Sequence, residues 1–485
     1  MGAFASGPLQ ASCRGRQVWY YTAMIRWLKS RLQKLVGRPD PGPRIIPREE
    51  HPVSRSAMSA NVLKVLTRLH NHGYAAYMVG GGVRDLLLGR EPKDFDVATD
   101  ATPDEVNSLF RNSRLIGRRF KIVHVHFGPE IIEVATFRAA AENGDGKVER
   151  SEDGMVLRDN VYGTLEEDAW RRDFSVNALY YNIADHSIVD YCGGWEDVQA
   201  GLLRMIGDPA ERFREDPVRV LRAVRFAAKH GFRIERETEA PMRELGDLLN
   251  GVPPARLFEE VNKLFLSGAA VQSYELLRYY DVFRILFPIT EEALQREEEG
   301  FPLLFLIRAL ENTDRRVNEG RPVTPAFLIA ALLWEPVRQH VASARKAGEN
   351  PGRALQVAAE QVVSGQVKHV AIPRRFSTAA REIWSLQDRF HQRAGKRPWK
   401  LMEHPRFRAA YDFLVLRAAA GEIDPEVSDW WTRFQDADEG ERERMAAQQQ
   451  GGGGNNRKKG RRRGGRRRKP KSGAGSEQSG GNGGE

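Results

Sequence analysis

The sequence contains few cysteines and no long apolar segment. Cys13 and Cys192 are the two cysteines among 485 residues, and their separation fits neither a disulfide framework nor a metal-binding spacing. Such scarcity is typical of a protein of the reducing cytoplasm. No apolar run approaches the roughly 18–20 residues needed to span a membrane, which excludes an integral membrane protein. With 41% hydrophobic and 29% charged residues, the chain is typical of soluble globular proteins and long enough for several domains.

Acidic side chains are missing from residues 1–39. This part of the chain includes "MIRWLKSRLQKLVGR", whose composition resembles that of an amphipathic targeting or membrane-surface segment. It lacks the uninterrupted apolar core and the small-residue cleavage site of a secretory signal. The alternative is that translation starts at Met24. We therefore expect a basic N-terminal extension over residues 1–57, with peripheral membrane contact and the translation of residues 1–23 left open.

The positive charge of the chain is concentrated at its end. Residues 451–485 carry 11 Lys or Arg against two Glu, a net charge of +9, while the whole chain has a net charge of +10. Because this segment has no large apolar side chain with which to build a core, an Arg/Gly-rich tail over residues 441–485 is predicted to be disordered. Such a tail is typical of an arm that binds nucleic acid, and the alternative is a solubilising tail.

Residues 58–200 predict a mixed α/β unit. Ser59 is placed to cap a helix that ends near Gly73, with apolar side chains at helical spacing between them. "YAAYMVGG" and "DFDVAT" predict two strands, "VRDLLLGR" predicts a short helix between them, and Thr102 opens another helix. "FKIVHVHFG" and "EIIEVATFRA" predict two more strands around a turn at Gly128.

The rest of the chain predicts helices. "EDPVRVLRAVRFAAKHGF" repeats apolar residues at spacings of three and four, and no strand-like alternation or fixed repeat follows it. Similar patterns occur over residues 255–286, 300–311, 324–341, 354–366 and 377–418. The expected architecture is an α+β head on a long helical body, followed by the basic tail.

Two aspartates lie in the predicted strand "DFDVAT". Side chains of a strand alternate between its faces, so Asp94 and Asp96 share one face while Phe95 and Val97 pack on the other. Two carboxylates at this spacing repel each other unless a cation lies between them, and Mg²⁺ prefers oxygen ligands and leaves room for substrate phosphates. The pair therefore predicts a site for one or two magnesium ions that hold a triphosphate. The alternative is an exposed edge strand with solvated acids.

A glycine-rich loop precedes this strand. Gly80, Gly81 and Gly82 allow the backbone to approach a phosphate closely, and the helix that follows presents free N–H groups. Arg84 could add a charged contact. A triple glycine alone could be a plain turn, but its position 12 residues before a two-acid strand makes the combination far more specific.

Two further acids are candidates for a metal site. Glu133 lies in the predicted strand "IIEVATF", where an unpaired glutamate between apolar residues would be costly to bury. Asp173 lies in "RRDFSVNAL", where it could bind ribose and phosphates together with Arg171 and Arg172. The residues alone do not rank Glu133 against Asp173 as the third carboxylate.

Five motifs in order, spread over about residues 59–265, carry a family resemblance. They resemble the class II template-independent nucleotidyltransferases, the family of bacterial poly(A) polymerases and tRNA CCA-adding enzymes. The motifs are "VGGGVRDLLLG", "DFDVATD", "EVATFR", "RRDFSVNAL" and "EDPVRVLRAVRFA".

The resemblance implies both a fold and a reaction. It implies a nucleotidyltransferase head with a mixed sheet of about five strands, a helical neck over residues 201–265 and an RNA-binding helical body over residues 266–440. It also implies a Mg²⁺-dependent two-metal transfer of a nucleotide from a triphosphate such as ATP to an RNA 3′-hydroxyl. The implied catalytic residues are Asp94, Asp96, Glu133 and Asp173, of which Asp94 and Asp96 would bind metal. The implied nucleotide-binding residues are Gly80, Gly81, Arg84, Asp85, Arg171, Arg172, Asp216 and Arg219.

The motif "EDPVR" is implied to read the base edge of the incoming nucleotide. A carboxylate from Glu215 or Asp216 and the guanidinium of Arg219 on one helix would offer an acceptor and donors together. The alternative is an (i, i+3) salt bridge on a solvated helix.

Within the family, several features favour poly(A) synthesis over CCA addition. The stretches "RIIPREEHPVSR", "LFRNSRLIGRRFKIVHVHFGPEIIEVATFR" and "GKRPWKLMEHPRFRAAYDFLVLRA", and the Arg-rich tail, resemble the poly(A) polymerase branch. None of the 11 histidines is followed by Asp, so the metal phosphohydrolase domain of some CCA-adding enzymes is absent. Trp384, Trp399 and Phe407 could stack RNA bases, but their helical spacing favours packing.

The expected substrates are ATP and the 3′ ends of single-stranded RNA, with no DNA specificity. RNA chaperones or degradation-machinery proteins remain open as partners of the tail. Two alternatives from other classes are a non-catalytic RNA-binding protein with a decayed head and a nucleotidyltransferase that shares only the head. The complete acid motifs argue against the first, and the "EDPVR" neck motif argues against the second.

Overall fold

A computed structural model describes residues 42–117, 121–139, 148–150, 156–159, 161–295 and 303–451. The chain divides into two compact units, residues 1–385 and 386–485, and each is described by itself. The predicted membrane-surface segment lies outside the described residues, as do residues 452–485 of the basic tail. Helix α23 (Glu439–Gly451) is described, so the chain is still helical beyond residue 441, where the tail was predicted to begin.

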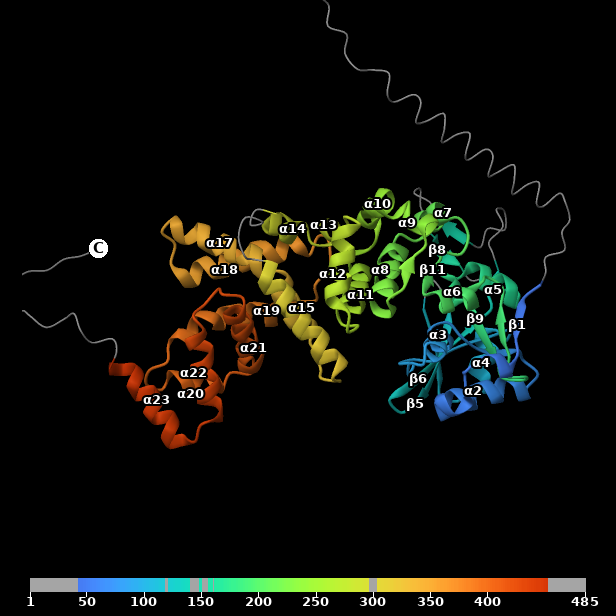
Figure 1. Cartoon of the computed structure of the whole chain (residues 1–485), viewed down its shortest axis with the longest axis horizontal. Helices are drawn as coiled ribbons and strands as arrows, with labels where there is room; N and C mark the ends of the chain where they lie inside the picture. The colour runs from blue at the N-terminus through green and yellow to red at the C-terminus, as the bar shows by residue number, and fades with distance from the viewer. Residues whose placement is uncertain are drawn as a thin grey trace, which may run out of the picture. The chain divides into compact units, whose positions relative to one another are not determined.

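The head contains one mixed sheet of eight strands in the order β1-β10-β9-β2-β3-β6-β5-β4 (Figure 1). The expectation of about five strands is wrong in number, because short strands extend the sheet at both edges. The chain entering the head pairs as β1 with β10, and β4 pairs with β5 at the opposite edge. The strands are β1 (Arg44–Ile46), β2 (Ala76–Val79), β3 (Asp96–Thr99), β4 (Ser113–Ile116), β5 (Ile122–Phe127), β6 (Glu130–Thr136), β9 (Leu179–Asn182) and β10 (Ile188–Asp190).

Small two-stranded sheets and short helices complete the head. The first such sheet pairs β7 (Val148–Arg150) with β8 (Val156–Asp159), and the second pairs β11 (Leu202–Leu203) with β12 (Arg233–Ile234). The helices are α2 (Ala60–Asn71), α3 (Gly81–Leu87), α4 (Pro103–Leu109), α5 (Leu165–Arg171) and α6 (Gly194–Ala200), and the 3₁₀ turns are η1 (Arg48–Glu50), η2 (Arg55–Ala57) and η3 (Ser175–Asn177).

Helix α2 forms as its sequence predicts. The Ser59 side chain accepts a hydrogen bond from the amide of Val62, which satisfies one of the free N–H groups at the helix start. Val62, Val65, Leu66 and Leu69 are fully buried and pack toward β2, β3 and β6. Thr102 likewise caps α4, as predicted, in a reciprocal capping box with Glu105.

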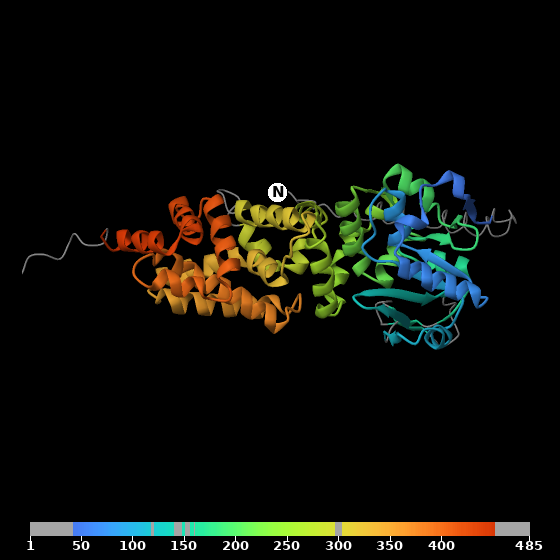
Figure 2. The same cartoon turned by 90° about the horizontal axis from the view of Figure 1, so that it is seen from below.

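Residues after the head are helical, as the apolar spacing predicts, and Figure 2 shows the change from arrows to coiled ribbons along the colour bar. Helices α11 and α12 both pack against α8, which leads out of the head. None of the helices in the described ranges is long and apolar enough to cross a membrane. The helices of this part are α7 (Pro209–Glu215), α8 (Val218–His230), α9 (Arg236–Glu239), α10 (Met242–Leu245), α11 (Pro254–Phe265), α12 (Ala270–Tyr279), α13 (Phe283–Leu286), α14 (Pro288–Gln295), α15 (Leu303–Asn318), α16 (Pro325–Leu332), α17 (Trp334–Lys346), α18 (Pro351–Gln366) and α19 (Arg374–Gln387), with the 3₁₀ segment η4 (Gly246–Gly251).

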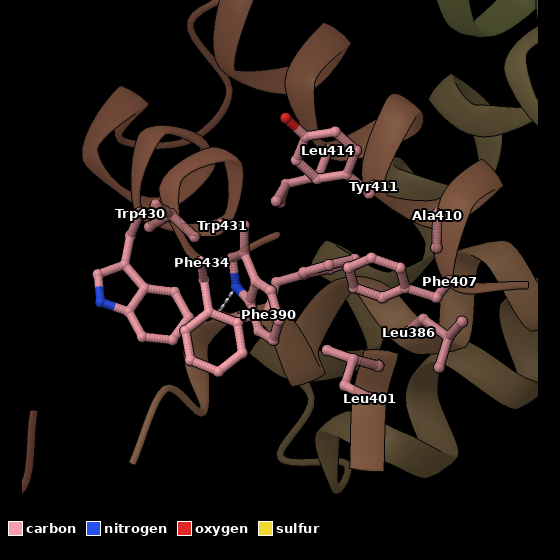
Figure 3. Packing of buried hydrophobic residues seen from close by; sticks show 11 residues of the cluster. Leu386, Phe390, Leu401, Phe407, Ala410, Tyr411, Leu414, Trp430, Trp431 and Phe434 are labelled. Atoms are coloured by element: carbon pink, nitrogen blue, oxygen red, sulfur yellow. Dashed lines mark hydrogen bonds between the residues drawn. The ribbon is translucent and has the colours of Figure 1, made fainter. Parts of the chain in front are cut away.

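The second unit has an aromatic core (Figure 3). Trp431 is fully buried among Phe390, Phe407 and Phe434, and its Nε1 donates a hydrogen bond of 2.8 Å to the carbonyl oxygen of Phe390. The described helices of this unit are α20 (Arg397–Met402), α21 (Phe407–Ala419), α22 (Pro425–Asp436) and α23, and η5 (Asp388–His391) precedes them.

The packing interpretation of the tryptophans is confirmed. Trp384 is fully buried in the first unit, where its Nε1 donates to the carbonyl oxygen of Ala330. In the second unit Phe407 is 7% exposed, and Trp399 packs edge-on against Phe434. Trp384 and Phe407 therefore stabilise the body and offer no stacking platform for RNA.

We expect Trp431→Phe to lower the free energy of unfolding by about 2–3 kcal/mol, because it leaves a cavity and removes the donor to the buried Phe390 carbonyl. The matched control is Trp170→Phe, since Trp170 is 48% exposed and should shift stability by less than about 0.5 kcal/mol. Urea unfolding of the full chain measures both variants. Equal losses in the two variants would contradict the structural role of Trp431.

Candidate active site

A row of polar side chains crosses the head sheet. Strands β3 and β6 pair in parallel with Asp96 opposite Glu133, and β5 pairs with β6 so that His124 lies opposite Glu133. The His124 Nε2 and Glu133 Oε1 atoms are 3.4 Å apart. Phe95 and Val97 point away from this row and are buried, as the strand pattern predicts.

Asp94 and Glu133 depart from two details of the sequence interpretation. Strand β3 begins at Asp96, so Asp94 lies in the exposed loop just before it. The Glu133 side chain is 53% exposed, because Ile132 and Val134 occupy the other, buried face of β6. The argument that Glu133 would be costly to bury is therefore wrong, and its position opposite Asp96 replaces it.

The electrostatics of Asp96 indicate a concentration of negative charge. The pKa of Asp96 is raised to about 6, by burial first and then by the nearby carboxylates of Glu133 and Asp94, while Arg172 and Arg222 oppose the shift. The ionised form of Asp96 is thus disfavoured as the site stands. A cation close to these three carboxylates would reverse that penalty.

The carboxylates fit a hard divalent cation that brings further oxygen ligands with it. Asp94, Asp96 and Glu133 offer the oxygen donors that Mg²⁺ prefers. No group of three or more His, Cys, Asp or Glu within the described ranges is already arranged around a common metal position. Phosphate oxygens of a bound triphosphate would therefore have to complete the coordination of any ion held here.

The glycine loop lies against Asp96. Gly80 has a φ of +74° and a ψ of −132°, a conformation that side-chain-bearing residues rarely adopt. A Cβ atom at Gly80 would lie 3.9 Å from Asp96 Oδ2 and 3.6 Å from Arg172 Nη1. One at Gly81 would meet the guanidinium of Arg84 at 3.4 Å. The loop therefore gives its backbone close access to a carboxylate and an arginine together, while Gly82 packs against Phe95.

Arg84 and Asp85 are buried in the protein. The Arg84 side chain donates to Asp85 Oδ1 at 2.7 and 2.9 Å and to Asn177 Oδ1 at 2.5 Å, and it is 3% exposed. Its guanidinium also lies over the ring of Phe226 at 5.0 Å. These contacts tie α3 to η3 and α8, so the predicted nucleotide-binding pair faces inward.

The two arginines that precede Asp173 make different contacts. Arg172 donates to Asp168 Oδ2 at 2.9 Å and to the hydroxyl of Tyr180 at 2.7 Å. Although burial lowers the pKa of Arg172, Tyr180 and Asp168 raise it above its usual range. Arg171 donates to the carbonyl oxygen of Ala139, and burial lowers its pKa to about 10.

Asp173 is fully engaged by its neighbours. Its Oδ2 accepts from Arg222 Nε at 2.7 Å, and its Oδ1 accepts from Asn177 Nδ2 and from the Phe174 amide at 3.1 and 2.8 Å. Burial opposes ionisation, but Arg222 and these hydrogen bonds hold the pKa of Asp173 well below its usual range. The structure thus places Asp173 in an ion pair, whereas it brings Glu133 beside Asp96.

The "EDPVR" residues do not lie on one helix, so that part of the prediction is wrong. Glu215 ends α7, Asp216 caps it, and Arg219 lies in α8 beyond the break at Pro217. Glu215 accepts from Arg219 at 3.1 Å. Both carboxylate oxygens of Asp216 accept from Arg256 of α11, at 2.8 and 2.7 Å.

An arginine cluster surrounds these motifs. Burial, and then Arg219, lower the pKa of Arg212 to about 10, and burial followed by Arg138 and Arg212 does the same for Arg171. Glu215 is one of the few acids among them, and it pairs with both Arg212 and Arg219. An excess of buried positive charge is the environment that a polyanion such as a triphosphate stabilises.

Sequence inspection missed four residues of this arrangement. Most of their partners are far away in the chain or in another element, so spacing gives no signal for those contacts. The one available signal is the arginine-rich face of "PVRVLRAVRF". The residues are Arg138, Arg212, Arg222 and Arg256.

Comparison with known proteins decides the family. A model described as "Poly A polymerase head domain" matches residues 76–204, and one described as "Polymerase A arginine-rich C-terminus" matches residues 347–469. Residues 231–294 match "Probable RNA and SrmB- binding site of polymerase A". Poly(A) polymerase I of Salmonella typhi is 49% identical over 417 residues, which cover 84% of this chain and 88% of that protein. The chain belongs to the poly(A) polymerase I family.

The CCA-adding enzymes are more distant from this poly(A) polymerase I family member. The CCA-adding enzyme of Bacillus pumilus is 36% identical over 52% of this chain and 60% of that protein. The solved structure of the Thermotoga maritima CCA-adding enzyme complexed with tRNA is 17% identical, with a TM-score of 0.51 over 80% of this chain and 86% of that one, and shows a shared fold. The resemblance read from the five motifs is confirmed, and so is the preference for the poly(A) polymerase branch.

Proposed function

We propose that the chain is a polynucleotide adenylyltransferase that transfers AMP from ATP to RNA 3′-hydroxyl groups without a template. The 3′-oxygen would bond to the α-phosphorus of ATP, the bond to pyrophosphate would break, and the hydroxyl would lose its proton. The observation that supports this most strongly is the meeting of Asp96, Glu133 and the Gly80 loop at one position, in a chain of this family.

Asp94, Asp96 and Glu133 would hold the divalent ions, and Mg²⁺ suits their oxygen donors best. Bound there, such ions would lower the pKa of the RNA 3′-hydroxyl and would stabilise the leaving pyrophosphate. Glu133 is our candidate for the third carboxylate, because it lies opposite Asp96 and is accessible. Asp173 already neutralises the partly buried Arg222, and we assign it a positioning role.

The arginine cluster would bind the triphosphate. Besides burial, Arg212 and Arg219 lower the pKa of Arg171, and Arg219 lowers that of Arg212, so an incoming anion would relieve the repulsion among them. Arg172 lies beside Gly80, where the backbone allows a phosphate to approach. Arg84 and Asp85 would act indirectly, because they hold α3, which begins in the glycine loop, against helix α8.

Base selection is proposed for Asp216 and Arg219. Arg256 orients Asp216 through a two-point contact, and Arg219 is fixed by Glu215 and by the carbonyl oxygen of Arg212. Donors and an acceptor held in this way can discriminate one base edge from another.

The domain assignments remain proposals. We assign residues 58–200 to catalysis, 201–265 to the neck, 266–440 to RNA binding, and 441–485 to a basic tail that binds RNA phosphates. Residues 231–294 match the family of probable RNA-binding sites reported above, which supports RNA contact by the helices after α8.

The decisive experiment separates adenylate tailing from CCA addition. The full chain is incubated with Mg²⁺, an unstructured RNA and one nucleoside triphosphate at a time, and in parallel with a tRNA that ends in CC. We expect a long ladder on the unstructured RNA with ATP alone. A product that stops after one A on the tRNA, without a ladder on the other RNA, would support CCA addition instead.

A further inference from the structure

Four cationic side chains lie where helix α8 contacts the loop between α3 and β3. Arg225 and Lys229 lie one turn apart on α8, and Arg90 and Lys93 lie in the loop between α3 and β3. Arg90 Nη1 donates to the Lys229 carbonyl oxygen and contacts His230 Nδ1, both at 3.1 Å. These contacts fix the loop against the end of α8. We call the four cations, Arg90, Lys93, Arg225 and Lys229, the cationic ridge.

The cationic ridge has little compensating negative charge. Within the described part of the chain, Arg90, Lys93 and Lys229 form no ion pair with a carboxylate. Arg225 approaches Glu260 at only 3.9 Å, and its buried Nε has no hydrogen-bond partner among the described residues. Charges this close repel, and a polyanion would stabilise their arrangement.

Two buried or largely buried acids nearby are already committed, while Glu91 and Asp94 lie exposed in the same loop as Arg90 and Lys93. Asp85 pairs with Arg84 and Asp173 pairs with Arg222. Arg84, Arg222 and Arg225 all lie around the ring of Phe226, at 5.0, 5.2 and 4.7 Å, so three guanidinium groups share one aromatic side chain.

Charge repulsion within the cationic ridge contributes to the lowered pKa of Lys229. Burial lowers the pKa of Lys229, and Arg84, Arg225 and Lys93 add to that shift against the attraction of Asp85.

The cationic ridge continues a stripe that begins at the nucleotide residues. Arg219, Arg222, Arg225 and Lys229 follow one another along one side of α8 over about 15 Å, at 1.5 Å per residue. Arg219 belongs to the proposed base-reading motif. Lys229 lies at the other end of the stripe, beyond Arg222 and away from that motif. A ligand bound along the ridge would therefore adjoin the incoming nucleotide without overlapping its site. In nucleotide transfer, the ligand that adjoins the incoming nucleotide is the acceptor strand.

We propose that the cationic ridge binds the phosphates of the acceptor RNA strand next to its 3′ end. The ammonium and guanidinium groups of the ridge suit phosphate oxygens, which carry no sequence information. The inference rests on the proposed function, because it takes the acceptor to be a single-stranded RNA. It adds a second phosphate-binding surface, formed by the catalytic head and α8, to the one proposed for the tail.

The test compares Lys93→Ala and Lys229→Ala with Lys64→Ala in the full chain. Lys64 is an exposed lysine of α2 that donates a hydrogen bond to Asn61. Its removal changes the net charge by the same amount as each ridge substitution. The affinity for a labelled oligoadenylate is measured by anisotropy without ATP, between 50 and 200 mM salt. Each ridge substitution should reduce the magnitude of the negative slope of log affinity against log salt by about 0.7, so that the loss of affinity between 50 and 200 mM salt becomes about 2.6-fold smaller. Their double variant should reduce this magnitude by about 1.4, and Lys229→Arg should keep the original slope.

Three results would overturn the proposal. They are unchanged slopes in both ridge variants, losses no larger than in Lys64→Ala, or weaker ATP binding with unaltered RNA binding. Failure of the proposed function is separate, because it would show as no incorporation of ATP by the unsubstituted protein whatever the RNA affinities. A rise in the KM for RNA with kcat retained would further support the cationic ridge.

Discussion

Replacing Asp96 with Asn should reduce nucleotide transfer about a thousandfold or more, while the metal-free protein becomes more stable. Loss of a metal ligand removes several kcal/mol of transition-state stabilisation, and about 4 kcal/mol corresponds to that factor. Because the folded pKa of Asp96, about 6, lies above the ordinary value of 3.8, its contribution to stability is complete below 3.8 and lost as the pH rises through 6. At pH 8 the carboxylate therefore destabilises the metal-free fold, and Asn should raise the free energy of unfolding by roughly 1–3 kcal/mol.

The opposite signs of these two effects make the experiment specific. Activity is measured with saturating ATP and RNA, and thermal unfolding is measured in EDTA at pH 5 and 8. Asp100→Asn is the matched control, since Asp100 is an exposed acid just after the same strand and an amide can still accept from the Ala75 amide. Retained activity in Asp96→Asn, or an equal activity loss in Asp100→Asn, would refute the metal assignment.

Replacing Arg222 with Met should destabilise the fold by about 3–5 kcal/mol, because it leaves the carboxylate of Asp173 buried without its cation. The folded pKa of Asp173 lies below its ordinary value, so its ion pair stabilises the protein above pH 3.8 and loses that contribution as the pH falls below. The variant should therefore show a weaker acid destabilisation than the unsubstituted chain.

A double variant identifies the cause of that loss. Combining Arg222→Met with Asp173→Asn removes both charges, and we expect it to recover more than half of the lost free energy of unfolding. Chemical denaturation of all four proteins at pH 7 gives the coupling energy. Additive losses would show that Arg222 stabilises the fold through packing on Phe226 and not through Asp173.

The parts of the site that local spacing determines could be predicted from the sequence. Asp96 and the glycine loop are separated by a short segment, and strand alternation alone places Phe95 and Val97 in the core. Glu133 could be named as a candidate but not preferred to Asp173 as the third carboxylate. That choice depends on the register of β6 against β3, which local spacing does not determine. The same holds for Arg256, whose two-point contact with Asp216 joins α11 to the end of α7.

The architecture was predicted at the level of a mixed head and a helical body. The strand number was not, because the edge strands β1 and β4 and the strand β10 beside β1 have only three or four residues each, which local propensity marks weakly. The break at Pro217 was misread as one helix, although a proline after Asp216 favours a boundary there. Partly buried arginines such as Arg222 could not be found from composition, since charged residues are expected at the surface.

The parallel pairing of β3 with β6 also determines when the carboxylate row can exist. Parallel neighbours need a long crossover, here through α4, β4 and β5, so Asp96 and Glu133 meet only after the intervening chain has folded. A nascent chain that ends before Glu130 therefore has no metal site to occupy. A one-residue slip of β6 would turn Glu133 to the buried face and put an apolar neighbour beside Asp96. Errors in strand register would thus produce folded-looking but inactive molecules.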